Sequence, residues 1–438
     1  MHLLNRHRGK AALAAIAAGT LALSACSGDG DDGTTEDGKI QLTVQGFGTL
    51  GYIQAGLEEQ YESENPDIDV VFEGDGLNFE NDFRPAMEAA LQAGSGAGDV
   101  MAMDEQAMAQ MMANEDYWVD LAEYGYDSRA EEYPQWKWDL GHTPGGKLAG
   151  FGTDVGGMGM CYRTDLFAEA GLPTERTEVA AAWADWEGFT TVAQTFVDSG
   201  VDAAFLDSPT QLQNMLLGQV AGQSDGQMYV DAEGNLTLDS EAVQTSVNTI
   251  IELNEMGAIG TFVSWSEEWI AAQAEGGFAT MPCPAWMLGI VEDNAGDAGA
   301  GNWDFAAAPG VSGNWGGSWL LVPAQSPNPE EAAALAAWLT APEQQVAAFE
   351  SGPFPSTLEG AQMVSDYTNP YFNDAPVGEI IAASVAEFPA LEYTELHPSV
   401  KGAVEGALNG LVDGTYSSDD IWDAIQSEAE NAVELGGL

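Results

Sequence analysis

A glycine-rich hexapeptide near the start of the chain has the spacing of a phosphate-binding loop. Residues 46–51, GFGTLG, match the pattern G-x-G-x-x-G, and Glu73 stands 22 positions after Gly51. Glycines in such a loop let the backbone approach a pyrophosphate at a helix N-terminus, and the later acid binds a ribose hydroxyl. The motif alone indicates a dinucleotide, although any parallel α/β domain binds its ligand at the loop after the first strand.

Other catalytic side chains are sparse. His142 and His397 are the only histidines beyond residue 25, so a histidine triad or a zinc site has few candidates. Neither G-x-S-x-G nor H-E-x-x-H occurs. The 70 acidic residues offer many carboxylate pairs for glycoside hydrolysis, and this abundance makes any one pair uninformative. We predict no catalytic residue, no metal and no cofactor.

Strands that alternate with helices would position the side chains of the first part of the chain. The pattern predicts strands at 40–45, 68–73 and 99–103, with helices at 53–64 and 82–93 between them. Such alternation is typical of parallel α/β layering. A further strand is expected at 156–162, after an aromatic-rich stretch without clear periodicity at 115–147.

The second half of the sequence predicts more helix than the first. We expect a long helical region at about 180–275, then short strands at 278–283 and 303–308 around a loop of Gly, Asn and Asp at 291–302. Another strand is expected at 316–323. The next helix begins at Asn328-Pro329-Glu330-Glu331, where proline and acids suit a first turn, and the last helix ends at Gly436.

The N-terminus resembles an export signal. Residues 1–10 are basic, residues 11–23 are apolar but short for a membrane span, and Leu23-Ser24-Ala25-Cys26 matches the bacterial lipoprotein box. We therefore expect a signal peptide at 1–25 and lipidation of Cys26; the alternative is an ordinary signal with a chance cysteine. An exported, membrane-anchored protein meets no pool of NAD, so the glycine loop is expected to serve another ligand.

A polar stretch follows Cys26. Residues 26–38 contain mostly Gly, Asp and Thr, which predicts a flexible tether. Asp29, Asp31 and Asp32 could suggest a calcium loop, but the glutamate of loop position twelve is missing. No later segment is long and apolar enough to span a membrane.

The charge excludes some partners. Three of the eleven basic residues precede Cys26, which leaves 8 basic against 70 acidic residues and a net charge of −62. Nucleic-acid binding and docking of a basic patch on anionic lipid are therefore excluded. Since 45% of the residues are hydrophobic, the chain is expected to be globular despite this charge. One hypothesis is a salt-adapted acidic surface.

Two cysteines remain beyond the lipidation site. In an oxidising extracytoplasmic compartment Cys161 and Cys283 form either a disulfide or two buried free thiols. Their separation of 122 residues does not decide between the two.

Four blocks in order resemble the family 1 extracellular solute-binding proteins of bacterial ABC importers. They are Asp99–Asp104; Gly152–Gly157 with Cys161–Phe167 and Ala170–Pro173; Gly276–Met281 leading to Trp286; and Ala307–Pro309 with Gly316–Trp319 and the helix 329–339. The segments Thr153–Gly157, Cys161–Arg163 and Cys283–Gly289 look most like the cellobiose and cello-oligosaccharide branch, with xylo-oligosaccharides and other β-linked glucans as alternatives.

The resemblance implies an α/β fold of two lobes, the type II periplasmic-binding-protein-like architecture. An N-terminal lobe would comprise 39–154 and 315–357, and a C-terminal lobe 155–314 and 358–438. An oligosaccharide would bind in the cleft and pass to the importer's permease. The resemblance thus implies a monomeric, non-enzymatic lipoprotein that meets the membrane only through its anchor.

Sugars are bound by aromatic rings that stack on C–H faces and by carboxylates and amides that accept hydroxyl protons. Position after strands and residue type select Trp286, Trp319, Trp265, Phe47 and Phe372 as aromatic candidates, and Asp104, Asp154, Asp207 and Asn78 as polar candidates. Trp136 and Trp138 stay undecided, and Trp269 and Trp338 are expected in the core. A lipid-anchored glycoside hydrolase is the alternative function.

Overall fold

The structure is a computed structural model that describes residues 34–436, apart from 36, 49, 225, 311, 312, 350, 387, 389 and 390. The chain divides into the units Met1–Asp32 and Gly33–Leu438, and the second is described here. The expected signal peptide, Cys26 and most of the tether lie outside the described residues. Within the described part, no helix combines the length and the apolar character that crossing a bilayer requires.

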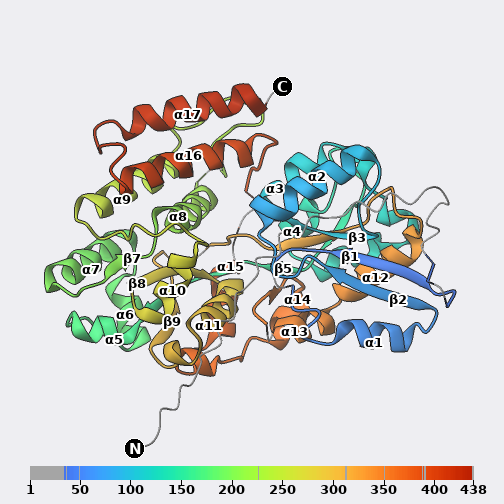
Figure 1. Cartoon of the computed structure of the whole chain (residues 1–438), viewed down its shortest axis with the longest axis horizontal. Coiled ribbons are helices and arrows are strands. Elements are labelled where there is room, and N and C mark those ends of the chain that lie inside the picture. The colour runs from blue at the N-terminus through green and yellow to red at the C-terminus, as the bar shows by residue number, and fades with distance from the viewer. Residues whose placement is uncertain are drawn as a thin grey trace, which may run out of the picture. The chain divides into compact units, whose positions relative to one another are not determined.

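The first sheet has five strands in the order β2-β1-β3-β10-β4. Figure 1 labels β1, β2 and β3 of this sheet. Its strands are β1 Ile40–Gln45, β2 Ile68–Glu73, β3 Val100–Asp104, β10 Ser318–Leu321 and β4 Gly150–Gly152. β1 is parallel to β2 and β3, as predicted, whereas β10 is antiparallel to both β3 and β4. Alternation in the β1 segment IQLTVQ buries Leu42 and Val44 in the core of this sheet.

Seven α-helices belong with this sheet, and π-helical and 3-10 turns link them. The helices are α1 Leu57–Glu64, α2 Arg84–Ala93, α3 Glu105–Met112, α4 Gln135–Leu140, α12 Pro329–Leu339, α13 Pro342–Phe349 and α14 Leu358–Met363. α12 begins with proline in its first turn and buries an alanine- and leucine-rich face against the sheet. The predicted helix 53–64 starts later, at Leu57, because Gly56 before it has a positive φ of 68°.

The second sheet has four strands in the order β7-β8-β6-β9. Its strands are β7 Ala204–Leu206, β8 Phe278–Pro284, β6 Met158–Arg163 and β9 Trp303–Ala307. β6 is antiparallel to β8 and β9, and β7 is parallel to β8. Every residue of β6 and β8 is buried, so both faces of the sheet are covered.

Helices from the middle and the C-terminal part of the chain surround the second sheet (Figure 1). They are α5 Thr164–Glu169, α6 Arg176–Ala182, α7 Trp186–Ser199, α8 Pro209–Gln223, α9 Glu241–Glu255, α10 Glu267–Glu275, α11 Ala285–Gly299, α15 Val377–Val385, α16 His397–Val412 and α17 Ile421–Gly436. The predicted loop is wrong over 291–295, where α11 is helical; the helix is then broken at Gly296, which has a φ of 52°, and a last helical stretch ends at Gly299. Met287, Leu288, Val291 and Ala295 bury one face at helical spacing before the break.

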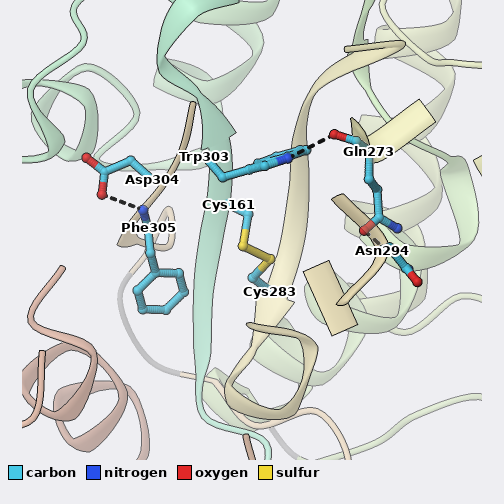
Figure 2. The surroundings of a disulfide bond; sticks show 7 residues. All are labelled: Cys161, Gln273, Cys283, Asn294, Trp303, Asp304 and Phe305. Atoms are coloured by element: carbon cyan, nitrogen blue, oxygen red, sulfur yellow. Dashed lines mark hydrogen bonds between the residues drawn. A yellow bond between two sulfur atoms is a disulfide. The ribbon is translucent and has the colours of Figure 1, made fainter. Parts of the chain in front are cut away.

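A disulfide joins the two central strands of the second sheet (Figure 2). Cys161 on β6 and Cys283 on β8 have Cα atoms 5.5 Å apart, and the alternative of two free thiols is excluded. Nearby, Trp303 Nε1 donates a 3.0 Å hydrogen bond to the Gln273 carbonyl (Figure 2). The disulfide therefore lies in a buried core that hydrogen bonds also stabilise.

The chain passes between the two sheets at residues 152–158. Here the two-residue strand β5 Asp154–Val155 pairs with β11 Phe354–Pro355, which comes from a much later part of the sequence. The amide of Trp315 donates a 2.8 Å hydrogen bond to the Gly156 carbonyl. A Cβ at Gly156 would lie 1.7 Å from the Trp315 carbonyl oxygen, so only glycine allows this approach. The boundaries proposed for the two lobes stay a prediction.

Candidate functional site

Asp104 ends β3 at the point where the first sheet meets the crossing segments. Its Oδ1 accepts a 3.0 Å hydrogen bond from the Gln106 amide and so caps α3. Burial raises the pKa of Asp104 to about 7. The sheet thus holds a carboxyl group rigidly at a strand end, as the sequence predicts.

The neighbouring Glu105 is tied to the crossing by Asn314. Asn314 Nδ2 donates to Glu105 Oε2 at 2.7 Å, while Asn314 Oδ1 accepts from the Gly156 amide at 2.8 Å. Glu105 is 1% exposed, and burial raises its pKa to about 8. The sequence prediction missed both residues; the only signal was the polar Asn314 in a glycine-rich turn beside Trp315.

Lys137 and Asp154 place a buried cation and a buried acid at the same crossing. Lys137 Nζ has no hydrogen-bond partner in the described part of the chain, and it lies 3.3 Å from the ring centroid of Trp319. Burial lowers the pKa of Lys137 to about 8. Asp154 Oδ1 accepts from Thr153 Oγ1 at 2.7 Å and from the Ser318 amide at 2.8 Å, so it holds the crossing together. As a ligand contact, Asp154 stays a prediction.

Trp286 brings an aromatic ring from the second sheet to the carboxyl group of the first. It follows β8 in the first turn of α11 and is partly exposed; its Nε1 donates to the Trp315 carbonyl at 3.0 Å. A methyl group on Gly316 would lie 3.4 Å from Trp286 Nε1 and 3.8 Å from Asp104 Oδ2. Trp286 and Asp104 therefore flank Gly316, and we name these three residues with Glu105 and Asn314 the crossing cluster.

Trp265 extends the aromatic surface of Trp286. The two rings have centroids 6.2 Å apart and planes inclined by 22°. Trp265 is 41% exposed and has a φ of 72°, which is rare for a bulky residue. The adjacent Ser264 shares hydrogen bonds with the hydroxyls of Ser208 at 2.8 Å and Thr210 at 3.1 Å.

Lys401 on α16, in the C-terminal part of the chain, interacts electrostatically with Asp104 and Glu80. It forms a 3.3 Å ion pair with Glu405, and Glu405 also accepts a 2.8 Å hydrogen bond from Asn214 on α8. Burial acts to lower the pKa of Lys401, but the carboxylates of Glu405, Glu80 and Asp104 outweigh it and raise the pKa. The sequence prediction also missed this cation, since no local pattern links residue 401 to residue 104.

Three of the sequence-predicted ligand contacts have fully buried side chains, and as ligand contacts they stay predictions. Trp319 lies between β3 and β4, under Lys137, and its Nε1 donates to the Lys137 carbonyl. Phe372 is enclosed beside Tyr371. Asp207 accepts a 2.8 Å hydrogen bond from Trp269 Nε1, and burial raises its pKa to about 7. Each therefore has a structural role.

Phe47 and Asn78 lie in the loops after β1 and β2. Phe47 packs on Phe79 and Phe83, with ring centroids at 4.6 Å and 5.7 Å. Phe47 also lines a small, open hollow of about 20 Å³ together with the glycines of the hexapeptide and the acids Glu73 and Asp75. Two acids at the rim disfavour a pyrophosphate there. As ligand contacts, Phe47 and Asn78 stay predictions.

The two undecided tryptophans pack inside the protein. Trp136 meets Phe388 edge-on at 5.9 Å, and Trp138 stacks on Tyr133 at 5.8 Å. Trp269 is buried, as the sequence predicts. Among the described residues, no group of three or more His, Cys, Asp or Glu side chains is arranged to hold a metal ion.

A family model described as bacterial extracellular solute-binding protein matches residues 57–373 of this chain. A crystal structure of an extracellular solute-binding protein family 1 member is similar over 90% of this chain and 99% of that chain, with 35% identity and a TM-score of 0.78. The similarity thus includes both sheets and the crossing segments between them.

Two further similar proteins are named for a sugar or were solved with one. The lactose-binding protein of Rhizobium radiobacter is 26% identical over 317 residues, which cover 69% of this chain and 72% of that protein. The ABC transporter associated binding protein from B. animalis subsp. lactis Bl-04, solved with β-1,6-galactobiose, has a TM-score of 0.74 at 20% identity and covers 90% of this chain and 98% of that chain. At this identity the second similarity shows the fold alone.

Proposed function

This chain belongs to the bacterial extracellular solute-binding proteins, and on that premise we propose that it captures an oligosaccharide for an ABC importer. The ligand would bind between the two sheets, against the crossing cluster, and would be delivered to the permease unchanged. The family is extracellular, so the site works outside the cytoplasm. Lipidation of Cys26, with the protein acting as a monomer, completes the proposal.

One observation carries the proposal: Trp286 and Asp104 approach the same glycine from different sheets. An indole ring stacks on the apolar C–H face of a sugar, and a carboxyl group beside it accepts or donates at the hydroxyl edge. Because one group comes from each sheet, a ligand that touches both stabilises the arrangement in which the sheets approach each other.

A β-linked disaccharide is the ligand that we propose, with cellobiose or a longer cello-oligosaccharide first. The sequence resemblance to the cellobiose branch supports this choice, whereas the lactose-binding relative supports a galactose unit. Both sugars are β-1,4-linked and end in glucose, and they differ in the orientation of one hydroxyl group. A polar contact to that hydroxyl would decide between them.

Calorimetric titration of the processed chain with cellobiose, lactose and maltose tests the proposal, followed by chromatography of each mixture. We expect cellobiose to bind most tightly and to be recovered intact. Tight binding of lactose alone would correct the sugar but keep the function, and binding of none would contradict both. Cleavage of the sugar would instead support the alternative of a glycoside hydrolase.

A tryptophan variant locates the binding site. We expect Trp286→Ala to weaken sugar binding about tenfold to a hundredfold, as the loss of a buried aromatic contact does. Trp422→Ala on α17 is the matched control, since Trp422 bonds to Asn248 away from the crossing cluster. Equal affinities of the two variants would contradict the site.

A further inference from the structure

Residues 177–438 contain 39 Asp and Glu residues and a single lysine or arginine, Lys401. We propose that Lys401 is a positioning residue for ligand capture: from α16 it attracts carboxylates that belong with the first sheet, and so it favours the arrangement in which both sheets contact the ligand. This inference rests on the proposed function and adds to it the group that makes the affinity depend on salt. We name Lys401, Glu405, Glu80 and Asp104 the α16 charge cluster.

The α16 charge cluster lies where helices that belong with different sheets meet. α16 packs against α3, which begins directly after Asp104, and also against α8. Lys401 Nζ lies 3.3 Å from Glu405 Oε1, one turn further along α16, and the same oxygen accepts a 2.8 Å hydrogen bond from Asn214 on α8. The lysine is therefore anchored to helices of the second sheet.

Two carboxylates on the side of the first sheet attract the anchored lysine. Glu80 lies on the π-helical turn Phe79–Phe83, and Asp104 ends β3. Burial acts to lower the pKa of Lys401, whose side chain is 12% exposed, but Glu405, Glu80 and Asp104 outweigh burial and raise that pKa. Burial raises the pKa of Asp104 to about 7, and Lys401 acts against this rise. The attraction thus joins residues that belong with different sheets.

The neighbouring basic side chains do not make the same link. Arg84 pairs with Glu80 at 3.0 Å, but both residues lie on the side of the first sheet. His397 lies one turn before Lys401 on α16, and burial together with Lys401 lowers its pKa to about 3, so the imidazole is neutral at neutral pH. Without Lys401, Glu405 would therefore meet like charges on the side of the first sheet.

Salt distinguishes this role of Lys401 from ordinary packing. Two acidic surfaces repel each other as they approach, and salt screens the repulsion beyond a Debye length of about 10 Å at 0.1 M and about 3 Å at 1 M. A neutral sugar adds no charge of its own, so the part of the affinity that salt changes comes from the protein. The effect of removing the Lys401 charge should therefore be largest at low salt, whereas the loss of an apolar contact would persist at high salt.

Calorimetric titration with cellobiose and lactose at pH 8, where Asp104 is mostly ionised, tests the proposal in about 0.05 M and about 1 M sodium chloride. We expect Lys401→Met to bind about tenfold more weakly than the wild type at the lower salt and less than about threefold more weakly at the higher salt. Lys401→Arg keeps the charge and should stay within about threefold of the wild type at both. Lys39→Met is the matched control and should change nothing, because Lys39 bonds to the Ile68 carbonyl at the other end of the parallel strands from Asp104.

A charge change on the side of the first sheet gives a second comparison. Glu80→Gln should weaken sugar binding in the wild type, because it removes an attraction for Lys401. The same change should strengthen binding in Lys401→Met, because it removes a repulsion from Glu405. Opposite signs in the two backgrounds are expected if these residues interact through charge, and the same sign in both would overturn the α16 charge cluster.

Small-angle X-ray scattering of the ligand-free proteins measures the arrangement of the sheets without any sugar. Lys401→Met should have a larger radius of gyration than the wild type in about 0.05 M salt and the same radius in about 1 M salt. Lys401→Arg should match the wild type in both.

The outcomes distinguish the two proposals. If the wild type binds a sugar but Lys401→Met binds it as tightly, or loses the same factor at both salt concentrations, the role of Lys401 is overturned and the proposed function stands. If the wild type binds neither sugar, the proposed function falls, and the radii of gyration decide the rest. A larger radius for Lys401→Met at low salt would then support the attraction by Lys401, and equal radii would overturn it.

Discussion

Asn314 fastens Glu105 to the crossing between the sheets by a 2.7 Å hydrogen bond from its amide nitrogen to Glu105 Oε2. Asn314 Oδ1 also accepts a hydrogen bond from the Gly156 amide. One asparagine therefore links α3, beside the first sheet, to the segment that leads to the second sheet. A carboxyl group enclosed in this way resists ionisation, and its protonation should therefore affect how firmly the crossing holds.

The first prediction concerns the pH dependence of stability. Burial raises the pKa of Glu105 from 4.5 to about 8, so its stabilising contribution is complete below about pH 4.5 and is lost as the pH rises through 8. The glutamine of Glu105→Gln stays neutral at every pH. This variant should therefore lack the part of the fall in unfolding free energy that Glu105 causes, which is at most about 1.4 kcal/mol per pH unit. Urea denaturation at several pH values between 5 and 8 measures it. Glu343→Gln, at an exposed position in the first turn of α13, is the control; identical slopes for the two variants would contradict the prediction.

The second prediction concerns the space between Trp286 and Asp104. Gly316 has a φ of 80°, so Gly316→Ala should cost about 1–2 kcal/mol of stability through backbone strain. Its methyl group would also occupy the proposed sugar position, and binding should weaken at least about tenfold. Gly414→Ala has nearly the same φ, 82°, and no atom within 4 Å of the added methyl group. Gly414→Ala should lose comparable stability and no affinity, and a loss of affinity shared by both variants would refute the location.

The third prediction concerns the disulfide between β6 and β8. The bridge closes a loop of 122 residues, and its removal should lower the free energy of unfolding by about 4 kcal/mol, mainly by releasing the unfolded chain. Cys161→Ala/Cys283→Ala avoids buried hydroxyls, and guanidinium denaturation measures the change. Wild-type protein denatured in the presence of a reductant should show the same loss. A double variant as stable as the oxidised wild type would contradict this account.

The fourth prediction concerns salt. Of the eight basic residues beyond Cys26, five are in ion pairs with acids and a sixth, Lys137, is buried; the paired ones are Arg84, Arg129, Arg163, Arg176 and Lys401. Few cations therefore separate the acids at the surface, and their repulsion should be screened by salt. We expect the melting temperature at neutral pH to rise by several degrees between about 0.1 M and 1 M salt. The rise should shrink near pH 4, where carboxylates are protonated; no rise at neutral pH would exclude salt adaptation.

Local pattern predicted much of the fold. The segments 40–45 and 68–73 form β1 and β2 with the predicted limits, because alternation and the flanking turns are properties of the segment itself. Local pattern could not predict the antiparallel insertion of β10 between β3 and β4, because β10 follows both of its partner strands by more than 160 residues in the sequence. The sequence pattern does not predict α11, because the turn-forming residues at 291–302 obscure the apolar spacing of its buried face.

Position at a strand end is also a local feature, and it selects Asp104 and Trp286, which lie on either side of Gly316. Their role as ligand contacts stays a prediction. Position after a strand does not say whether a side chain is covered, so the burial of Trp319 under the neighbouring Lys137 could not be predicted. Asn314 and Lys401 come near Asp104 and Glu105 only through tertiary packing, and nothing in their own segments distinguishes them.

The position of β10 has a consequence for the order in which the chain can fold. All four strands of the second sheet lie within residues 158–307, so that sheet can form as soon as this stretch has crossed the membrane. The first sheet begins at residue 40 but lacks an interior strand until Ser318–Leu321 arrives. During export the edge of β3 in the three-stranded sheet of β1, β2 and β3 therefore stays unpaired until β10 is available. This unpaired edge is the part of the chain that a chaperone would have most reason to protect.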